Sequence, residues 1–333
     1  MSNCLGVIWS LLRPQTYLLM SVYVSLGIAY GLSEQNYMLS SFLADQWLAI
    51  VGVYAALALW YIAGTAFNDY ADYEIDRVNL KGDRQRPLVT GTVSRRDLLH
   101  YGIFATFASL VVIALTTSLV ITLLYSAMLV LNVAYSLKPF QISRRGGLAP
   151  LLLPLGYIVL TISSGMLLTG LNFSVPDVLI LAGMYLHFMA RIVLKDHRDV
   201  RGDAMVGKKT LILKYGNHKV SLLAMVLFIA STALLALVLS RQLLFILPFI
   251  ALLSSGATYV LLQLSRENRW LYQKPLITVF GRLCSGIITL IIIGLLPQII
   301  HMESYQPRFI AIVITALFFV SISEIIKLQH PTQ

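Results

Sequence analysis

The fold is decided by one stretch, residues 47–76, which reads WLAIVGVYAALALWYIAGTAFNDYADYEID. Its apolar part, residues 47–69, is long enough to cross a bilayer as a helix, because a hydrocarbon core of about 30 Å needs roughly 20 residues. Carboxylates gather where this apolar run ends. The stretch therefore predicts a membrane-spanning helix that leads into an acidic segment.

The composition extends that prediction to the whole chain of 333 residues. Hydrophobic residues make up 58% of it, charged residues make up 12%, and the mean hydropathy is +0.78. A soluble domain is about half apolar and a quarter charged, so the composition excludes a soluble enzyme, a disordered chain and a disulfide-stapled secreted module. The two cysteines, Cys4 and Cys284, form neither a disulfide framework nor a metal-binding spacing. One helical bundle can use the whole chain, so we expect a single membrane domain over residues 1–333.

Ten apolar runs are long enough to span a bilayer. They lie at about 16–33, 47–69, 97–117, 119–137, 148–170, 177–196, 219–240, 243–264, 277–298 and 308–327. None alternates as a barrel strand does, so we expect an all-α polytopic membrane protein with nine to ten transmembrane helices. The first run shows no clear signal-peptide cleavage pattern and is expected to remain in the mature protein, after a short interfacial helix within residues 1–12.

The positive charges predict the orientation in the membrane. The net charge is +10, and the basic residues sit in short loops between apolar runs, which favours a membrane over nucleic acid as the partner. All 25 Lys and Arg residues except Arg241 and Arg308 fall on the same predicted side. This bias predicts that both termini and the four basic loops are cytoplasmic. Membrane lipids and an anionic substrate are then the expected partners, in the plasma membrane of a prokaryote.

Six aspartates repeat one spacing at the ends of the second and sixth runs. They are Asp69, Asp72 and Asp76 in the first copy, and Asp196, Asp199 and Asp203 in the second. Spacings of three and four residues predict that each trio shares one helix face, where like charges repel unless a cation binds between them. Carboxylates with little His or Cys nearby favour Mg²⁺, which commonly shares its coordination with substrate phosphates. Two such trios are therefore expected to hold Mg²⁺ and a diphosphate.

Basic residues accompany both trios. The first is followed by Arg77, Lys81, Arg84 and Arg86, and the second is interleaved with Lys195, Arg198 and Arg201. In such a mixture the acids can hold the metal while the bases hold phosphate oxygens. The alternative is a merely solvated pair of charged helix ends, which the repeated spacing disfavours.

Three stretches resemble known motifs. Asn68–Arg77 reads NDYADYEIDR, Arg86–Leu88 reads RPL and is followed by Gly91 and Ser94, and Lys195–Asp203 reads KDHRDVRGD. These stretches resemble the motifs of the UbiA superfamily of intramembrane prenyltransferases, over residues 10–300. The resemblance implies a helical bundle around a central cavity, with residues 301–333 as an added C-terminal helix. It also implies transfer of a polyprenyl group from its diphosphate to an aromatic or lipid acceptor, through a Mg²⁺-assisted allylic carbocation.

The resemblance assigns roles at the matched positions. The metal ligands are Asp69, Asp72, Asp76, Asp196, Asp199 and Asp203, of which Asp72, Asp76, Asp199 and Asp203 are also taken as catalytic. The substrate-binding residues are Asn68, Arg77, Tyr135, Lys138, Lys195 and Arg198. The pair Tyr135 and Lys138 is one residue shorter than the family's usual Tyr-x-x-x-Lys, so Lys138 is open between a phosphate contact and an interfacial lysine.

Other functions remain as alternatives. A terpene cyclase of the same superfamily would use the same diphosphate site, with the cation closing on itself. The aspartate motif of CDP-alcohol phosphotransferases does not fit, because Tyr73 follows Asp72. A transporter is disfavoured, because its ionisable residues would lie near the bilayer midplane. His187 is interpreted as a core histidine and His197 as a solvated loop residue.

Overall fold

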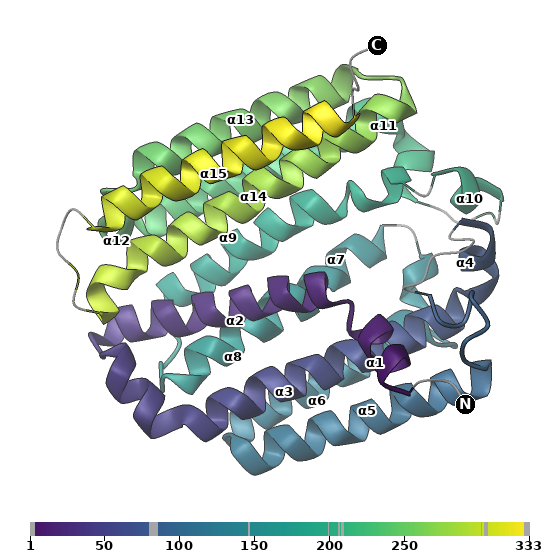
Figure 1. Cartoon of the computed structure of the whole chain (residues 1–333), viewed down its shortest axis with the longest axis horizontal. Helices are drawn as coiled ribbons and strands as arrows, with labels where there is room; N and C mark the ends of the chain where they lie inside the picture. Colours follow the sequence, from purple (N-terminus) through teal and green to yellow (C-terminus); the bar gives the residue numbers. More distant parts are fainter. Residues whose placement is uncertain are drawn as a thin grey trace. The chain divides into compact units, whose positions relative to one another are not determined.

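The computed structural model describes residues 4–79, 86–145, 147–198, 200–205, 207, 210–300, 302 and 306–329. Within this part of the chain every regular element is helical (Figure 1), which confirms the predicted all-α class. Ten helices of the described part are long and apolar enough to cross a membrane. Each of them overlaps one of the ten predicted apolar runs.

Contacts within the chain divide it into two compact units. Unit 1 comprises Met1–Gly27, Phe42–Leu168 and Arg201–Thr210, and unit 2 comprises Ile28–Ser41, Thr169–Val200 and Leu211–Gln333. The expectation of one domain over residues 1–333, with a core at 10–300 and an added helix in 301–333, stays a prediction.

Unit 1 carries the first acidic segment. Its elements are α1 (Cys4–Leu12), most of α2 (Pro14–Gln35), α3 (Leu39–Ala71), α4 (Tyr73–Asn79), α5 (Arg95–Thr116), α6 (Leu119–Ser136), the 3₁₀ turn η1 (Ile142–Arg144), α7 (Leu148–Pro154), the π-helix η2 (Leu155–Leu160), α8 (Thr161–Leu168) and most of α10 (Val200–Met205). The helix α1 agrees with the short helix predicted within residues 1–12. The elements α7, η2 and α8 form one span, Leu148–Leu168.

The helix α3 lies against its neighbours through polar contacts to its backbone. Ser109 of α5 donates to the carbonyl oxygen of Ala56 at 2.9 Å, and Asn132 of α6 donates to that of Trp60 at 3.1 Å. In a membrane, helices associate through close packing and such hydrogen bonds, because the lipid is as apolar as the side chains. Figure 1 shows α3, α5 and α6 running alongside one another. These contacts fix the position of the end of α3, where the acidic segment begins.

Small residues permit the closest helix contacts in unit 1. A Cβ atom built at Gly27 of α2 would lie 2.2 Å from the carbonyl oxygen of Ile162 in α8, which no side chain tolerates. A glycine is therefore required where these two helices cross.

Unit 2 contains the second long group of helices. Its elements are the end of α2, α9 (Val175–Ile192), the 3₁₀ turn η3 (Lys195–Arg198), α11 (Leu211–Val238), α12 (Ser240–Leu243), α13 (Leu247–Arg266), α14 (Trp270–Ile299) and α15 (Gln306–Gln329). Gly216 breaks the regular geometry of α11 with a φ of 78°, a conformation that favours glycine. Asn217 then donates to the carbonyl oxygens of Leu264, at 2.6 Å, and Glu267, at 2.9 Å. The kink thus ties α11 to the end of α13.

The interpretation of His197 as a solvated residue is wrong. The side chain is 1% exposed, and its Nε2 lies 2.9 Å from Oδ1 of Asn217. Its Nδ1 lies 3.1 Å from the carbonyl oxygen of Leu194. Asn217 lies on α11, twenty residues later in the chain. Its side chain satisfies the imidazole of His197 and so offsets the cost of burying it.

Candidate functional site

The first acidic segment spans a break between two helices. Asn68 and Asp69 lie in the last turn of α3, Asp72 lies at the junction, and Asp76 lies on α4. The prediction that this trio shares the face of one helix is therefore wrong. The carbonyl oxygen of Asp72 accepts from the backbone N–H groups of Ile75, at 2.9 Å, and Asp76, at 2.8 Å, so Asp72 begins a new helix. Aspartate is favoured at the position that begins a helix. The break between α3 and α4 also relieves the repulsion that the three carboxylates would exert along one continuous helix face.

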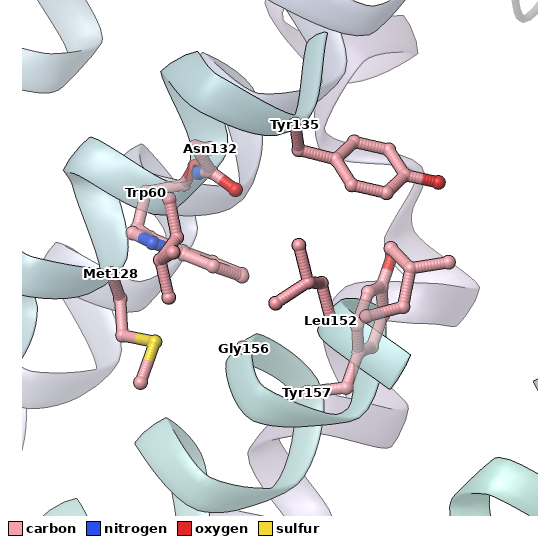
Figure 2. Close-up of a pocket in the computed structure, with 9 residues that line it drawn as sticks. Trp60, Met128, Asn132, Tyr135, Leu152, Gly156 and Tyr157 are labelled. Atoms are coloured by element: carbon pink, nitrogen blue, oxygen red, sulfur yellow. Dashed lines mark hydrogen bonds between the residues drawn. The ribbon is translucent and has the colours of Figure 1, made fainter. Parts of the chain in front are cut away.

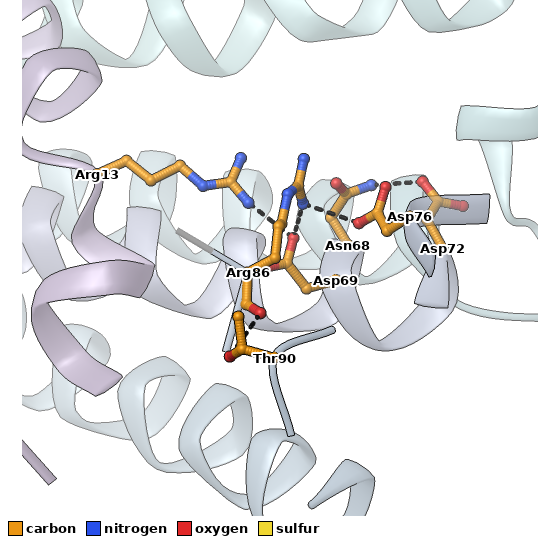
Figure 3. Close-up of polar contacts among 7 residues, drawn as sticks. All are labelled: Arg13, Asn68, Asp69, Asp72, Asp76, Arg86 and Thr90. Atoms are coloured by element: carbon orange, nitrogen blue, oxygen red, sulfur yellow. Dashed lines mark hydrogen bonds and ion pairs between the residues drawn. The ribbon is translucent and has the colours of Figure 1, made fainter. Parts of the chain in front are cut away.

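Asp69 is held by two arginines from distant parts of unit 1. Its carboxylate is 2% exposed, and Oδ1 accepts from Nη2 of Arg13, which precedes α2, at 2.7 Å. Nη1 of Arg86 donates to the same oxygen and also pairs with Oδ2 of Asp76 at 3.0 Å (Figure 3). Arg86 therefore bridges two of the three predicted metal ligands and partly neutralises their charge.

Asp72 has weaker partners. Nδ2 of Asn68 donates to its Oδ2 at 3.0 Å, and Nε of Arg144 lies 3.8 Å from its Oδ1. Arg144 also donates to the carbonyl oxygen of Ala71 at 3.1 Å. Arg144 comes from η1, so the loop after α6 reaches the end of α3. Of the three aspartates in this segment, Asp72 therefore has the least direct compensation of its charge.

The carboxyl group of Asp76 is shifted toward its protonated form. The pKa of Asp76 is raised to about 7. Burial is the largest cause, and the charges of Asp69 and Asp72 add to it against the opposing charge of Arg86. Burial penalises the charged form of a carboxylate, and neighbouring carboxylates add to that penalty. A bound cation would reverse this balance in favour of the carboxylate.

The residues of this segment fit a hard divalent cation. Three buried oxygens accept no hydrogen bond, although the last of them forms the ion pair with Arg86 at 3.0 Å: Oδ2 of Asp69, Oδ1 of Asp72 and Oδ2 of Asp76. Buried carboxylate oxygens of this kind normally have partners, and oxygen ligands suit Mg²⁺. In the described part of the chain, no three His, Cys, Asp or Glu side chains are grouped closely enough to hold a metal ion. The six ligand roles, and the four catalytic ones among them, stay predictions.

The second acidic segment also departs from a single helix. Asp196 lies on η3, where Nζ of Lys195 donates to its Oδ1 at 2.6 Å, and Asp203 lies on α10 with 1% of its surface exposed. Asp199 and the side chain of Arg198 lie outside the described residues. The prediction of one shared helix face is wrong here too, because α9 ends at Ile192 and is followed by the tighter turn η3. The imidazole of His197 caps this turn at the carbonyl oxygen of Leu194.

Three other predicted substrate contacts are Arg77, Lys138 and Tyr135. Arg77 is exposed, pairs with Glu74 at 3.5 Å and lies over the ring of Tyr73 at 5.5 Å. Lys138 is exposed in the turn after α6. Tyr135, in the last turn of α6, lines a cavity. The substrate-binding roles of these residues stay predictions.

That cavity lies within unit 1 and has a volume of about 40 Å³. Figure 2 shows its lining, which comes from α3, α6, α7 and η2. The lining residues are Trp60, Met128, Leu131, Asn132, Tyr135, Leu152, Leu153, Gly156 and Tyr157. Pro154 has no N–H to donate, and the π-helix η2 begins directly after it. The indole Nε1 of Trp60 is buried without a hydrogen-bond partner. The cavity is thus mainly apolar, with one free donor.

Sequence reasoning missed the residues that hold the first acidic segment. From the sequence alone, neither Arg13 nor Arg144 is assigned a role at the site. Arg86 is expected only among the bases that contact phosphate, and its pairing with Asp69 and Asp76 is visible only in the structure. The one available signal was that Arg13 and Arg86 are each followed by proline.

Relatives of known function match much of the chain. A digeranylgeranylglyceryl phosphate synthase of Thermococcus gammatolerans is 31% identical over 179 residues, covering 53% of this chain and 60% of that protein. A protein of the same name from Archaeoglobus fulgidus is 29% identical over 234 residues, covering 69% of this chain and 73% of that protein. The chain therefore aligns with less than two thirds of the first relative's length.

Solved structures share the fold. A structure of a digeranylgeranylglyceryl phosphate synthase superposes with a TM-score of 0.65 at 19% identity, covering 88% of this chain and 99% of that chain. A UbiA homologue from Archaeoglobus fulgidus, bound to DMAPP and Mg²⁺, gives a TM-score of 0.59 at 17% identity, covering 96% of this chain and 99% of that chain. The model of the UbiA prenyltransferase family matches residues 18–274. With its ten apolar helices, the chain is an integral membrane protein. The resemblance of its acidic motifs is confirmed, and the chain belongs to the UbiA prenyltransferase family.

Proposed function

We propose that the chain transfers a prenyl group from a prenyl diphosphate to a hydroxyl of a prenylated glyceryl phosphate. In this reaction the bond between the prenyl carbon and the diphosphate oxygen breaks, and the diphosphate leaves with the electron pair. The allylic carbocation is then attacked by the hydroxyl oxygen of the acceptor, which forms an ether bond and loses its proton. The product is a glyceryl phosphate with one more prenyl ether.

One observation carries this proposal. The chain belongs to a prenyltransferase family, and its first acidic segment has buried carboxylate oxygens without hydrogen-bond partners at Asp69, Asp72 and Asp76. Arginines surround the same segment. The carboxylates can bind a divalent cation, and the arginines can bind phosphate oxygens. Both kinds of group stabilise the negative charge of a leaving diphosphate.

The residues of the acidic segments would have different roles. The aspartates of each segment, Asp72 and Asp76 among those of the first, would hold Mg²⁺, which supplies charge neutralisation of the diphosphate when bound. Arg13 and Arg86 hold Asp69 and so fix the end of α3 against the loop before α5. Lys195 and Arg77 would contact phosphate oxygens. The UbiA homologue bound to DMAPP and Mg²⁺ supports this use of the fold.

The apolar cavity of unit 1 suits part of the prenyl chain. Its lining is mainly aliphatic and aromatic, and it lies along α3 on the side that faces α6 and η2. Trp60 precedes Asp69 by nine residues, or about 13 Å of helix. A chain attached to a diphosphate at the end of α3 therefore has an apolar recess within reach.

The acceptor is assigned from the relatives. The named relatives make a digeranylgeranylglyceryl phosphate, a glyceryl phosphate with two prenyl groups. Addition of the second group needs a singly prenylated glyceryl phosphate as acceptor. An aromatic acceptor, which the motifs alone left open, and a cyclase reaction without any acceptor are outcomes of the test below.

The test is release of diphosphate by the purified protein in detergent. The protein is given geranylgeranyl diphosphate and Mg²⁺, with geranylgeranylglyceryl phosphate, with a panel of aromatic acceptors, or with none. We expect release that depends on the glyceryl phosphate and falls to background in excess EDTA, with Mn²⁺ restoring part of it, because both ions prefer oxygen ligands.

Each other outcome contradicts a part of the proposal. Release only with an aromatic acceptor would refute the acceptor class. Release without acceptor would indicate a cyclase or idle hydrolysis, which the organic products distinguish. Undiminished turnover in excess chelator would refute the role of Mg²⁺.

We also propose that the acidic segments face the cytoplasm of a prokaryotic plasma membrane, because nearly all Lys and Arg residues fall on their side. Glu74→Cys, in a Cys4→Ser background, is expected to resist a membrane-impermeant maleimide in intact cells and to react in inside-out vesicles. Asp45→Cys, at the opposite end of α3, is the matched control and is expected to react in intact cells. The reverse labelling pattern would overturn the orientation.

A further inference from the structure

Arg191 is a cation at the end of a membrane-spanning helix that pairs with no acid among the described residues. It lies in the last turn of α9, and its Nη1 is buried with no hydrogen-bond acceptor. Within the described residues it forms no ion pair. By contrast, Arg13, Arg86 and Lys195 each pair with an aspartate. The absence of an anion at Arg191 therefore sets it apart from the other cations near the acidic segments.

The surroundings of Arg191 supply little compensation for its charge. The guanidinium lies 5.9 Å from the centre of the Phe188 ring, and its charge acts on the neighbouring His187 and Cys284. Both neighbours are buried and neither is an acid. A contact with an aromatic face stabilises a cation only weakly, whereas moving an arginine out of water toward the membrane is costly. An ionisable residue placed near the membrane without a compensating acid among the described residues is typical of a functional site.

Gly281 of α14 lies beside the guanidinium of Arg191. A Cβ atom built at Gly281 of α14 would meet only Nη2 of Arg191 within 4 Å, at 3.7 Å. Side chains elsewhere on α14 fill the contact with neighbouring helices, as Phe280 does against Phe228 at 5.5 Å between ring centres. Gly281 therefore leaves an opening of at least the size of a methyl group on the side of α14 that faces Arg191.

We propose that Arg191 binds the phosphate monoester of the glyceryl phosphate acceptor, with the opening at Gly281 admitting it. This inference rests on the proposed function. A guanidinium presents two parallel N–H donors that match two phosphate oxygens, and this match is strongest where water is excluded. Arg191 precedes Asp196 by only five residues, so a phosphate bound there would hold the acceptor close to the second acidic segment without occupying it.

The experiment compares two acceptors that differ only in the phosphate. Binding of geranylgeranylglyceryl phosphate and of geranylgeranylglycerol is measured by calorimetry in detergent, for the wild type and for Arg191→Gln. We expect Arg191→Gln to weaken binding of the phosphate by about 10- to 100-fold, the effect of losing charge-assisted hydrogen bonds, and to leave binding of the alcohol unchanged. The KM for geranylgeranyl diphosphate should stay within about twofold. Arg282→Gln, an exposed neighbour on α14, is the matched control and is expected to change neither affinity.

Two further variants keep the test decisive if Arg191→Gln does not fold. Arg191→Lys retains the charge and should lose only part of the affinity for the phosphate, because a lysine cannot donate the same parallel pair. Gly281→Val leaves the charge and narrows the opening, and should raise the KM for the phosphorylated acceptor alone.

Several results would overturn the assignment. Equal weakening for both acceptors, unchanged discrimination between them, or a raised KM for the diphosphate donor alone would each do so. Failure of the proposed function is distinguishable, because it would appear in the wild type as a lack of product with either acceptor.

Discussion

Asp72→Asn is expected to reduce prenyl transfer by at least about 100-fold, the scale seen when one electrostatic group that stabilises developing charge is removed. Asp72 is buried, and its Oδ1 has no hydrogen-bond partner. Among the described residues its one ion pair is with Arg144 at 3.8 Å, whereas Arg13 and Arg86 both pair with Asp69. Of the three aspartates in the segment, Asp72 is therefore the most available to a divalent cation.

The substitution removes charge while it preserves shape. Nδ2 of Asn68 donates to Oδ2 of Asp72 at 3.0 Å, and the amide oxygen of an asparagine can accept the same hydrogen bond. The backbone oxygen that begins α4 is unaffected. We therefore expect the variant to insert and fold, with a thermal unfolding temperature in detergent within a few degrees of the wild type.

The matched control is Glu74→Gln. Glu74 lies two residues away in the same segment, but its side chain is 68% exposed and pairs with Arg77 on the surface at 3.5 Å. Exposed pairs of this kind contribute little to stability, so the control should retain nearly full activity. Diphosphate release measured for both variants checks the prediction. Wild-type turnover in Asp72→Asn, or an equal loss in Glu74→Gln, would contradict the role of Asp72 as a cation ligand.

Much of the fold could be predicted because its cause is local. A run of about 20 apolar residues must be helical in a bilayer, since every backbone group has to be satisfied within its own segment. The run at 47–69 therefore reappears within α3, Leu39–Ala71. The helix break at Asp72 could not be foreseen from spacing alone, because intervals of three and four residues fit one continuous helix as well as two helices joined at an aspartate.

The partners of the site could not be predicted because they are tertiary. Arg13 lies 56 residues before Asp69, and Arg144 lies 72 residues after Asp72. Nothing in the local sequence links these positions, and only the packing of α2 and η1 in unit 1 brings them together. The burial of His197 has the same origin, because its partner Asn217 is placed by the kink of α11 at Gly216. The residue types thus indicated a metal and phosphate site. Which arginine pairs with which aspartate could be determined only from the fold.

Arg86→Gln is expected to destabilise the protein more than any other single change in the first acidic segment. Nη1 of Arg86 contacts both Asp69 and Asp76, and its side chain is only 16% exposed. Removing one partner from a buried ion pair costs about 3–5 kcal/mol, because the remaining charge is left without compensation. Here Arg13 still pairs with Asp69, and Asp76 can accept a proton because burial already raises its pKa to about 7. The loss should therefore lie near the lower end of that range, about 3 kcal/mol.

Added Mg²⁺ distinguishes this explanation from a simple packing defect. A cation bound by the segment replaces the positive charge that Arg86 supplied, so Mg²⁺ should raise the thermal unfolding temperature more in Arg86→Gln than in the wild type. The matched control is Arg95→Gln, because exposed Arg95 lies over the Tyr70 ring at 4.7 Å and donates to the carbonyl oxygen of Tyr70 without pairing with a carboxylate. Its stability should change by less than about 1 kcal/mol, with the same response to Mg²⁺ as the wild type. If Mg²⁺ stabilised all three proteins equally, the lost stability of Arg86→Gln would reflect packing, and Arg86 would not be the group that balances Asp69 and Asp76 before the metal binds.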